Sequence, residues 1–262
     1  MSSESYQKAN FEGLADNYSQ NRPQYPQRML AELRAFLPDG ALSVIDLASG
    51  TGISTRAVAK TLGDRANIVG VEPSEDMRRR AREDTDADAP ICYRDGSAEN
   101  LDRENASLDL IFVGQALHWF NRPKFYAEAG RTLKLGGVVA IARNTRNWQK
   151  SEFVSEYEAF HEKYLPGFLR TERELDAAAE LEALDWIERT ATFDEEWFRP
   201  MKKSSFLGMA QSSSKVTQAI TNAGKEKGMA ELIDMADRHA DGDGFLVMPY
   251  FSIMVCGIKG AK

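Results

Sequence analysis

Over the first 150 residues, short runs of consecutive apolar residues alternate with segments whose apolar residues recur at helical spacing. The runs predict strands buried on both faces of a sheet, and the segments between them predict helices. The predicted strands are Leu42–Leu47, Ile68–Val71, Ile91–Tyr93, Leu108–Val113 and Val138–Ala142. The predicted helices are Tyr25–Leu37, Ile53–Leu62, one opened by Pro73-Ser74, and one that has Pro123 in its first turn and runs to Leu135. This alternation indicates a doubly wound parallel sheet, with ligands expected at the carboxyl ends of the strands.

After Trp148 the pattern changes to aromatic residues at helical spacing. These residues predict a helix that is broken at Pro166-Gly167, and a second helix is predicted over Glu172–Leu184. The other expected elements are a strand at Trp186–Phe193, mostly helical structure over Met201–Ala240, and an apolar strand at Phe245–Ile258 that is interrupted at Pro249. We interpret Met201–Ala240 as an insertion that caps the sheet and not as a separate domain.

The composition of the 262 residues, 42% hydrophobic and 28% charged, is typical of one large globular α/β domain. The net charge of −7 disfavours nucleic acid as a partner, because neutralising phosphates requires clustered basic residues. The one basic run, at residues 78–82, is followed directly by acidic residues. We therefore interpret it as a solvated helix face.

Cysteine usage and hydropathy point to a cytoplasmic protein. Only Cys92 and Cys256 occur, and their separation favours neither a disulfide framework nor a cysteine metal site. No apolar run reaches membrane-spanning length, and residues 1–10 are polar, unlike a signal peptide. We expect no membrane partner and no metal.

The loop after the first predicted strand carries the most chemical information. The strand reaches Asp46, and a tight turn with glycines at positions 50 and 52 leads into the next helix. Glycines there let backbone N–H groups approach a ligand closely. A dinucleotide site would have a third glycine where this chain has Thr55, and the Asp46 carboxylate would face a pyrophosphate. The same carboxylate suits a ligand with an ammonium group.

Two further polar segments follow the next two strands. Glu72 ends the second strand, where a carboxylate can accept hydrogen bonds from both hydroxyls of a ribose. Asp95–Glu99 follows the third strand, and its small residues leave room for a flat base. Ser97 or Glu99 could accept a hydrogen bond from an exocyclic amine of that base.

These segments resemble the successive motifs of class I S-adenosylmethionine-dependent methyltransferases. The similar segments are Asp46–Gly52, Glu72–Ser74, Gly96–Glu99 and Arg131–Gly137. Two others, Tyr18–Pro26 and Ala116–Phe120, are similar to the narrower group that includes trans-aconitate methyltransferases. One position departs from the family, which usually has glycine where this chain has Ala48. We expect the loop there to keep a backbone conformation that is open to alanine.

The resemblance implies S-adenosyl-L-methionine as cofactor and assigns residues to each of its parts. Asp46, Gly50 and Thr51 would line the methionine, Glu72 the ribose, and Ser97 and Ala98 the adenine. Gln115 would touch the centre of the cofactor. The implied cofactor-binding residues are Tyr18, Arg22, Asp46, Ala48, Gly50, Thr51, Gly52, Glu72, Pro73, Met77, Ser97, Ala98, Glu99 and Gln115. Met77 could equally be a core residue, and Tyr18 and Arg22 could equally form a surface pair at a helix end.

On the substrate side, His118 and Trp119 follow the fourth strand, where substrate and cofactor should meet. His118 could act as a base or contact the substrate, or it could simply pack. A carboxylate acceptor is already ionised at neutral pH and would need no base. Arg143 and Arg146, near the fifth strand, are candidate cations for such an acceptor, and the alternative reading makes them ordinary surface arginines. His161 and His239 are interpreted as surface residues on helices.

The sequence therefore predicts a Rossmann-like methyltransferase fold, with a seven-stranded, mostly parallel sheet and a helical cap insertion. One domain over 1–262 would comprise a cofactor-covering segment (1–24), a cofactor-binding core (25–148), a helical substrate-side region (149–240) and a terminal strand (241–262).

The expected activity is direct methyl transfer to a small molecule, with O-methylation of a carboxylic acid suggested by the narrower resemblance. The alternatives are a nucleotide-dependent oxidoreductase and a non-catalytic S-adenosylmethionine-binding protein, and the acidic charge disfavours a nucleic-acid methyltransferase. The identity of the acceptor and the choice between monomer and homodimer stay open.

Overall fold

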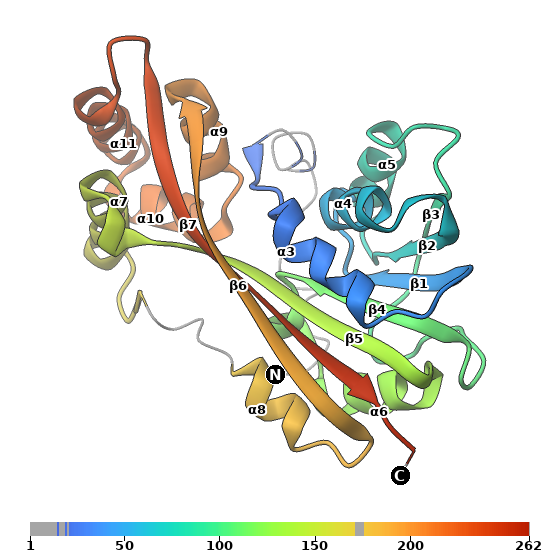
Figure 1. Ribbon diagram of the computed structural model, residues 1–262. Helices are drawn as coiled ribbons and strands as arrows, with labels where there is room; N and C mark the ends of the chain where they lie inside the picture. The colour runs from blue at the N-terminus through green and yellow to red at the C-terminus, as the bar shows by residue number, and fades with distance from the viewer. Residues whose placement is uncertain (1–14, 16–18, 20, 171–175, 262) are drawn as a thin grey trace.

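A seven-stranded sheet runs through the molecule in the computed structural model, which describes residues 15, 19, 21–170 and 176–261 (Figure 1). The strand order is β3-β2-β1-β4-β5-β7-β6. The strands are β1 (Leu42–Leu47), β2 (Ala66–Val71), β3 (Ile91–Arg94), β4 (Leu108–Gly114), β5 (Leu133–Arg146), β6 (Ile187–Lys202) and β7 (Phe245–Lys259). The first five pair in parallel, and β7 lies antiparallel between β5 and β6. The prediction of a mostly parallel, seven-stranded sheet is confirmed.

Helices connect the parallel strands and gather again after β5. They are α3 (Gln27–Ala31), α4 (Ile53–Leu62), α5 (Glu75–Glu83), α6 (Arg122–Thr132), α7 (Glu152–Tyr164), α8 (Ala177–Glu182), α9 (Lys203–Gln211), α10 (Ser214–Ala223) and α11 (Lys225–His239). Short 3₁₀ turns are η1 (Glu32–Ala35), η2 (Gly63–Arg65), η3 (Leu117–Trp119) and η4 (Trp148–Lys150). No helix within the described ranges is long and apolar enough to cross a membrane.

Several predicted elements need correction. Strand β5 continues past Ala142 to Arg146, and β6 continues past Phe193 to Lys202. The helix expected over Tyr25–Leu37 is short, and its second half is the 3₁₀ turn η1. Helix α6 ends at Thr132 instead of Leu135, because Leu133 already pairs with Leu108 in the sheet. Strand β7 continues through Pro249 without interruption.

Pro249 is tolerated because of where it lies in the sheet. The β5–β7 ladder ends at the pair Arg146 and Tyr250, and Pro249 is the next residue of β7 beyond that pair. The carbonyl of Pro249 accepts a hydrogen bond from the Asn147 backbone N–H, so its missing N–H faces the side beyond the end of that ladder. On the other side, β7 stays paired with β6 from Phe245 to Lys259.

Three apolar clusters fill the structure. One lies between the sheet and helices α6 and α8, and another lies between the sheet and helices α3 and α4. The third joins α7, α9, α10 and α11 to the end of β6 and the first half of β7 (Figure 1). We call these four helices the helical cluster. His161 is buried in this region, with its Nδ1 2.7 Å from the Tyr157 carbonyl oxygen, so its interpretation as a surface residue is wrong.

Candidate active site

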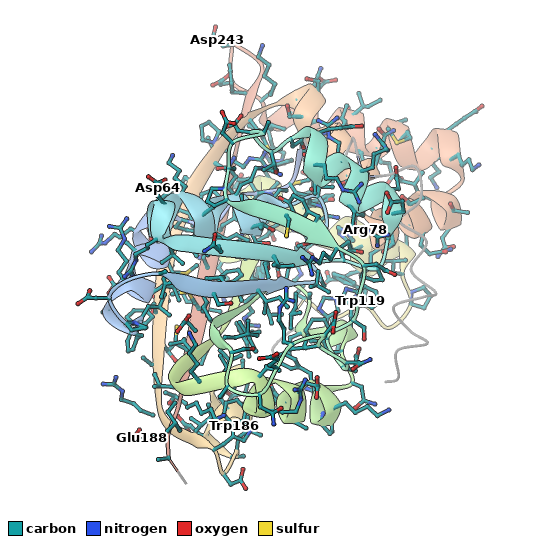
Figure 2. All side chains as sticks on the ribbon, turned by 90° about the vertical axis from the view of Figure 1, so that its right-hand side faces the viewer. Asp64, Arg78, Trp119, Trp186, Glu188 and Asp243 are labelled. Atoms are coloured by element: carbon teal, nitrogen blue, oxygen red, sulfur yellow. The ribbon has the colours of Figure 1, made fainter. Side chains whose placement is uncertain are left out.

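The carboxyl ends of β1 and β4 meet at the point where the strand order reverses. From β1 the chain proceeds outward to β2 and β3, and the other half of the sheet begins at β4. Open α/β sheets bind their ligands in the crevice at such a point. Figure 2 shows Arg78 and Trp119 toward this end of the strands, with Asp64 at the opposite end.

The loop after β1 is held in a left-handed backbone conformation. Gly50 and Gly52 have φ values of +55° and +78°, and Ala48 has +52°. Ala48 thus adopts the small left-handed region that is open to alanine, at a cost of about 1–2 kcal/mol. A Cβ on Gly52 would lie 2.2 Å from the Tyr93 hydroxyl, whereas one on Gly50 would meet nothing within 4 Å. The loop is packed tightly against the sheet at Gly52 and is open at Gly50.

Asp46 is a buried carboxylate with one oxygen satisfied and the other not. Its Oδ2 accepts hydrogen bonds from Ser54 Oγ at 2.8 Å and Thr55 Oγ1 at 2.6 Å. Burial raises the pKa of Asp46 to about 7, against the lowering effect of Thr55 and Ser54, and Glu72 raises it further. Thr55 therefore anchors Asp46 at the position where a dinucleotide site has glycine.

The unsatisfied oxygen belongs to a small group of buried polar atoms. Within the described residues, Asp46 Oδ1, Ser49 Oγ and Thr51 Oγ1 have no hydrogen-bond partner. A buried polar atom without a partner costs about 1–3 kcal/mol, so native proteins rarely leave three together. One acceptor and two hydroxyls within residues 46–51 fit a ligand that brings both donors and acceptors, as an amino acid does.

Glu72 joins the loops after β1 and β2. Its Oε2 accepts from the Gly50 backbone N–H at 3.0 Å, and its Oε1 accepts from the Ser74 backbone N–H at 2.9 Å. The Glu72 side chain is buried. The structure thus places the predicted ribose-binding carboxylate beside the open side of the glycine loop.

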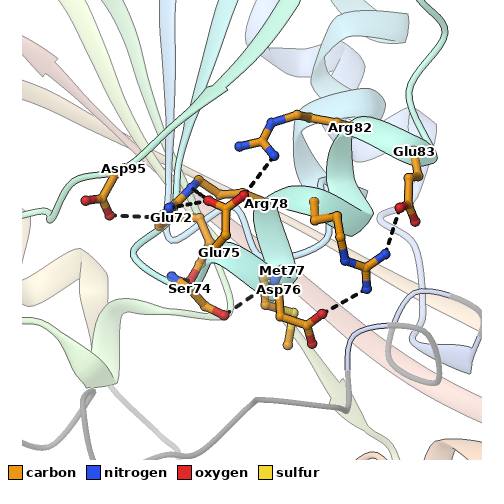
Figure 3. Close-up of polar contacts among 10 residues, drawn as sticks. Glu72, Ser74, Glu75, Asp76, Met77, Arg78, Arg82, Glu83 and Asp95 are labelled. Carbon is orange, nitrogen blue, oxygen red and sulfur yellow. Dashed lines mark hydrogen bonds and ion pairs between the residues drawn. The ribbon is translucent and has the colours of Figure 1, made fainter.

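Arg78 supports this arrangement and was missed in the sequence. Its guanidinium donates to the Glu72 carbonyl oxygen, to Asp95 Oδ1 at 3.0 Å and to Glu75 (Figure 3). It is buried, so the interpretation of the whole basic run as a solvated face is wrong at this residue. Arg79 does lie on the exposed face. The available signals were Glu75 three residues earlier on the helix and Asp95 at the end of the next strand.

The predicted adenine-side residues lie around the ends of β2 and β3. Met77 and Ala98 are buried, whereas Pro73 and Ser97 are exposed. Glu99 Oε1 accepts from the Asn121 backbone N–H at 2.8 Å and so fixes the start of α6. Met77 and Ala98 are compatible with packing on the face of a base, and Ser97 is compatible with a hydrogen bond at its edge.

Gln115, His118 and Trp119 follow β4. Gln115 has a φ of +59°, and its side-chain Nε2 donates to the Asn144 carbonyl oxygen at 2.6 Å. His118 is exposed, and its ring centroid is 4.8 Å from that of Trp119. These residues form the rim of the site between β4 and β5.

Arg143 and Arg146 do not form one binding pair. Side chains of a strand alternate between faces, so residues three apart in β5 point to opposite sides of the sheet. Arg146 Nε donates to the buried Glu158 at 2.6 Å, and its guanidinium carbon lies 5.0 Å from the Tyr157 ring centroid. Burial disfavours its charge, but Glu158 holds the pKa of Arg146 above its usual range. The alternative interpretation of Arg146 as an ordinary surface arginine is therefore wrong.

Two other arginines, Arg22 and Arg199, act on the same buried tyrosine as Arg146, although they lie far apart in the sequence. Arg22 Nη2 donates to the Ser212 carbonyl oxygen at 3.1 Å, and Arg199 Nη1 donates to the Asn21 carbonyl oxygen at 2.6 Å. Both arginines and Arg146 act on the buried Tyr250, whose pKa is raised by burial and lowered by these charges. We call Arg22, Arg146 and Arg199 the arginine cluster. Arg199 gave no sequence signal, and the predicted Tyr18 lies outside the described residues.

The segment before α3 is tied to the sheet beside the arginine cluster. Asn144 Nδ2 donates to the Gln24 carbonyl oxygen at 3.1 Å, and Ser252 Oγ donates to Asn144 Oδ1 at 2.6 Å. The Tyr25 ring stands edge-on to Phe112 of β4, with centroids 5.9 Å apart. Residues 21–25 therefore lie between the strand ends and the helical cluster.

Comparisons with known proteins agree with this geometry. Residues 45–141 match a family model described as a methyltransferase domain. A Dictyostelium discoideum protein named as a methyltransferase is 34% identical over 131 residues, which cover 50% of this chain and 47% of that protein. The chain spans about half the length of the curated relatives it matches. The family match includes Asp46, Glu72 and His118 but neither Arg22 nor Arg146.

Two solved structures share the fold over more of the chain. A type II methyltransferase from Anaeromyxobacter dehalogenans has a TM-score of 0.67 at 21% identity, covering 91% of this chain and 97% of that one. Phosphoethanolamine N-methyltransferase 2 of Haemonchus contortus, solved with S-adenosylhomocysteine, has a TM-score of 0.56 at 16% identity, covering 99% of this chain and 59% of that one. These likenesses show that the chain has a Rossmann-like methyltransferase fold.

Proposed function

We propose that this chain transfers a methyl group from S-adenosylmethionine to a small anionic molecule, a carboxylic acid in the simplest case. The observation that carries the first part is the buried Asp46, which has one oxygen without a partner and is followed by an open glycine loop with two further unsatisfied hydroxyls, Ser49 and Thr51. The methyltransferase-domain match over the same residues supports it.

The residues of the site fit the parts of this cofactor. Asp46 would accept from the ammonium group, and the hydroxyls of Ser49 and Thr51 would bond the remaining polar atoms of the amino acid. Glu72 would bond the ribose hydroxyls, and Met77 with Ala98 would pack on the base. When bound, the cofactor supplies a methyl group on positively charged sulfur, so activation does not depend on the protein.

The chain's own part in the reaction is to position the acceptor and exclude water. We place the acceptor at the rim made by Gln115, His118 and Trp119, with the helical cluster as its cover. A carboxylate acceptor is ionised at neutral pH and needs no base. His118 would take a proton only from an acceptor that still holds one, such as a hydroxyl.

The arginine cluster is the feature that favours an anionic acceptor. It brings three guanidinium groups to the buried tyrosines Tyr157 and Tyr250, and Glu158 is the carboxylate bonded to one of them. Guanidinium groups keep their charge when buried and bond carboxylates through two parallel N–H groups. Arg143 lies on the other face of β5 and is not part of this proposal.

Titration calorimetry tests the cofactor assignment. We expect S-adenosylmethionine and S-adenosylhomocysteine to bind at micromolar concentrations and NAD not to bind. Asp46→Asn should remove most of the affinity. Asp109→Asn is the matched control, because Asp109 is a buried aspartate on the neighbouring strand that bonds Lys134 at the opposite end of the sheet. Binding of NAD alone, or equal loss in both variants, would contradict the assignment.

The acceptor is tested with metabolite extracts and cofactor labelled in its methyl group. Extracts are first separated by anion exchange, and we expect the label in a product of the anionic fraction. Cofactor binding without a labelled product in any fraction would favour a non-catalytic binding protein. Label in the neutral fraction alone would leave the methyltransferase in place and exclude the anionic acceptor.

A further inference from the structure

The ends of β6 and β7 leave the main sheet as a two-stranded ribbon. Beyond the last residue of β5, only residues 198–202 of β6 and 245–249 of β7 continue to pair. One face of this ribbon packs on the helical cluster through Met201, Leu246 and Met248 (Figure 1). The opposite face carries large apolar side chains in contact with solvent. Phe198 is 58% exposed, Val247 50% and Phe245 36%.

The residues of this face form two parallel rows, because directly opposed residues of antiparallel strands point to the same side. On β7 the row is apolar throughout: Ile253, Phe251, Pro249, Val247 and Phe245. Of these, Val247 and Phe245 are exposed, Phe251 and Ile253 are half-buried, and Pro249 is buried. On β6 the opposed residues are Asp194, Glu196, Phe198, Pro200 and Lys202. We call the two rows together the ribbon face.

The charges of the ribbon face are separated along its length. Asp194 and Lys202 lie at its two ends, with Phe198 midway between them. Both charged residues are exposed, and neither side chain has a hydrogen bond or ion pair to another residue that the structure describes. Glu196, by contrast, is 3.7 Å from the Lys150 ammonium group.

We propose that the ribbon face is a homodimer interface, occupied by the ribbon face of a second copy of this chain. A two-fold axis through Phe198 and across the strands would place β6 over β6 of the second copy in the opposite direction. Phe198 would then meet its own counterpart, and the apolar row of β7 would meet itself. Asp194 of each copy would face Lys202 of the other, so the arrangement is self-complementary in charge and in polarity.

A second copy is favoured over an unrelated partner by this symmetry. Solvent-exposed apolar patches mark interaction sites, and a closed two-fold contact requires that one surface complement itself. The parallel alternative, with the strands in the same direction, would lose the contact between Asp194 and Lys202. The ribbon is narrow, so the interface is small and the dimer should dissociate in the micromolar range.

Sedimentation equilibrium over a range of protein concentrations tests the proposal. The full chain should form a dimer with a dissociation constant of roughly 1–100 μM, and Phe198→Asp should raise that constant at least about tenfold. Leu135→Asp is the control, because Leu135 is 66% exposed at the start of β5, away from the ribbon, and should leave the dimer unchanged. Thermal melting of each variant verifies that it is folded.

A charge exchange identifies the occupant as a second copy. Asp194→Lys and Lys202→Asp should each weaken self-association, because each places like charges opposite one another. Mixing the two variants should restore a dimer, since one copy then offers two lysines and the other two aspartates. A chain that stays monomeric at about 100 μM, or a dimer unaffected by Phe198→Asp, would overturn the proposal.

Discussion

The two halves of the sheet carry charged side chains of opposite sign. The half built from β1, β2 and β3 offers the buried carboxylates Asp46 and Glu72, held by hydroxyls and backbone N–H groups of adjacent loops. The half built from β5, β6 and β7 offers Arg146 and Arg199 of the arginine cluster, and Arg22 joins them from the segment before α3. The first half suits a cationic ligand and the second an anionic one. A site that joins a cationic methyl donor to an anionic acceptor requires both.

The halves also differ in how their charges are stabilised. Asp46 and Glu72 are fixed within one strand–loop–helix unit and its neighbour, and Asp46 shifts its pKa to about 7. Arg146 depends on a partner from another element, the buried Glu158 of α7. The carboxylate half should therefore tolerate changes elsewhere, whereas the arginine half depends on the helical cluster being in place.

The largest expected effect follows from removing that partner. Glu158→Ala leaves Arg146 mostly buried and unpaired, which should lower the free energy of unfolding by about 3 kcal/mol. Urea denaturation measures the loss. Glu196→Ala is the control, because its pair with Lys150 is exposed and should contribute less than about 1 kcal/mol. Equal small losses in both variants would mean that the arginine half does not depend on α7.

Crossed substitutions separate the two halves functionally. Asp46→Asn should weaken cofactor binding by about 2 kcal/mol, a factor of roughly 30, through loss of a charged hydrogen bond. Arg146→Gln should leave cofactor affinity unchanged and raise the KM for the labelled acceptor about tenfold. Calorimetry and initial rates on folded variants measure the two quantities. A change in cofactor affinity with Arg146→Gln would contradict the assignment of cofactor binding to one half of the sheet and acceptor binding to the other.

The raised pKa of Asp46 predicts a pH dependence of cofactor binding. Below the pKa of about 7 the free protein holds this carboxyl protonated, so binding an ammonium group must displace a proton. Affinity should fall about tenfold per pH unit there, and it should fall again above about pH 8, where the amino group loses its charge. Calorimetry from about pH 5.5 to 9 measures both limbs. In Asp46→Asn the acid limb should disappear, and a flat profile in the unsubstituted protein would contradict the role of Asp46.

The smallest effect concerns the strained loop. Ala48→Gly should stabilise the protein by about 1 kcal/mol, because glycine adopts a φ of +52° without the Cβ clash. Ala59→Gly, within α4, should destabilise it by a similar amount. Thermal or urea unfolding measures both. The same sign for the two substitutions would show that loop strain is not what distinguishes position 48.

The parallel half was predictable because its signals are local. β1 and α4 have the predicted boundaries, since an apolar run closed by glycines specifies a strand, a turn and a helix within 21 residues. Asp46 and Glu72 lie at the carboxyl ends of β1 and β2, where the predicted strand boundaries put them. The backbone at Ala48 could not be predicted, because tertiary packing of the loop, and not the preference of alanine, sets its conformation.

The antiparallel half was less predictable because its contacts are long-range. The alternating polar residues of β6 concealed a strand of 16 residues, and Pro249 suggested a break that the ladder avoids. His161 and Arg78 were interpreted as surface residues because their burial depends on elements distant in the sequence. Arg199 has no local feature that indicates its contact with residue 21.

Glu72 has a consequence for the rate at which the site fills. Two backbone N–H groups, from Gly50 and Ser74, hold its carboxylate through hydrogen bonds made within the protein. A flexible glutamate would lose rotamer entropy when it binds a ribose, whereas Glu72 loses this entropy when the protein folds. Such preorganisation predicts rapid association in a single kinetic phase, with no slow rearrangement of the two loops after encounter.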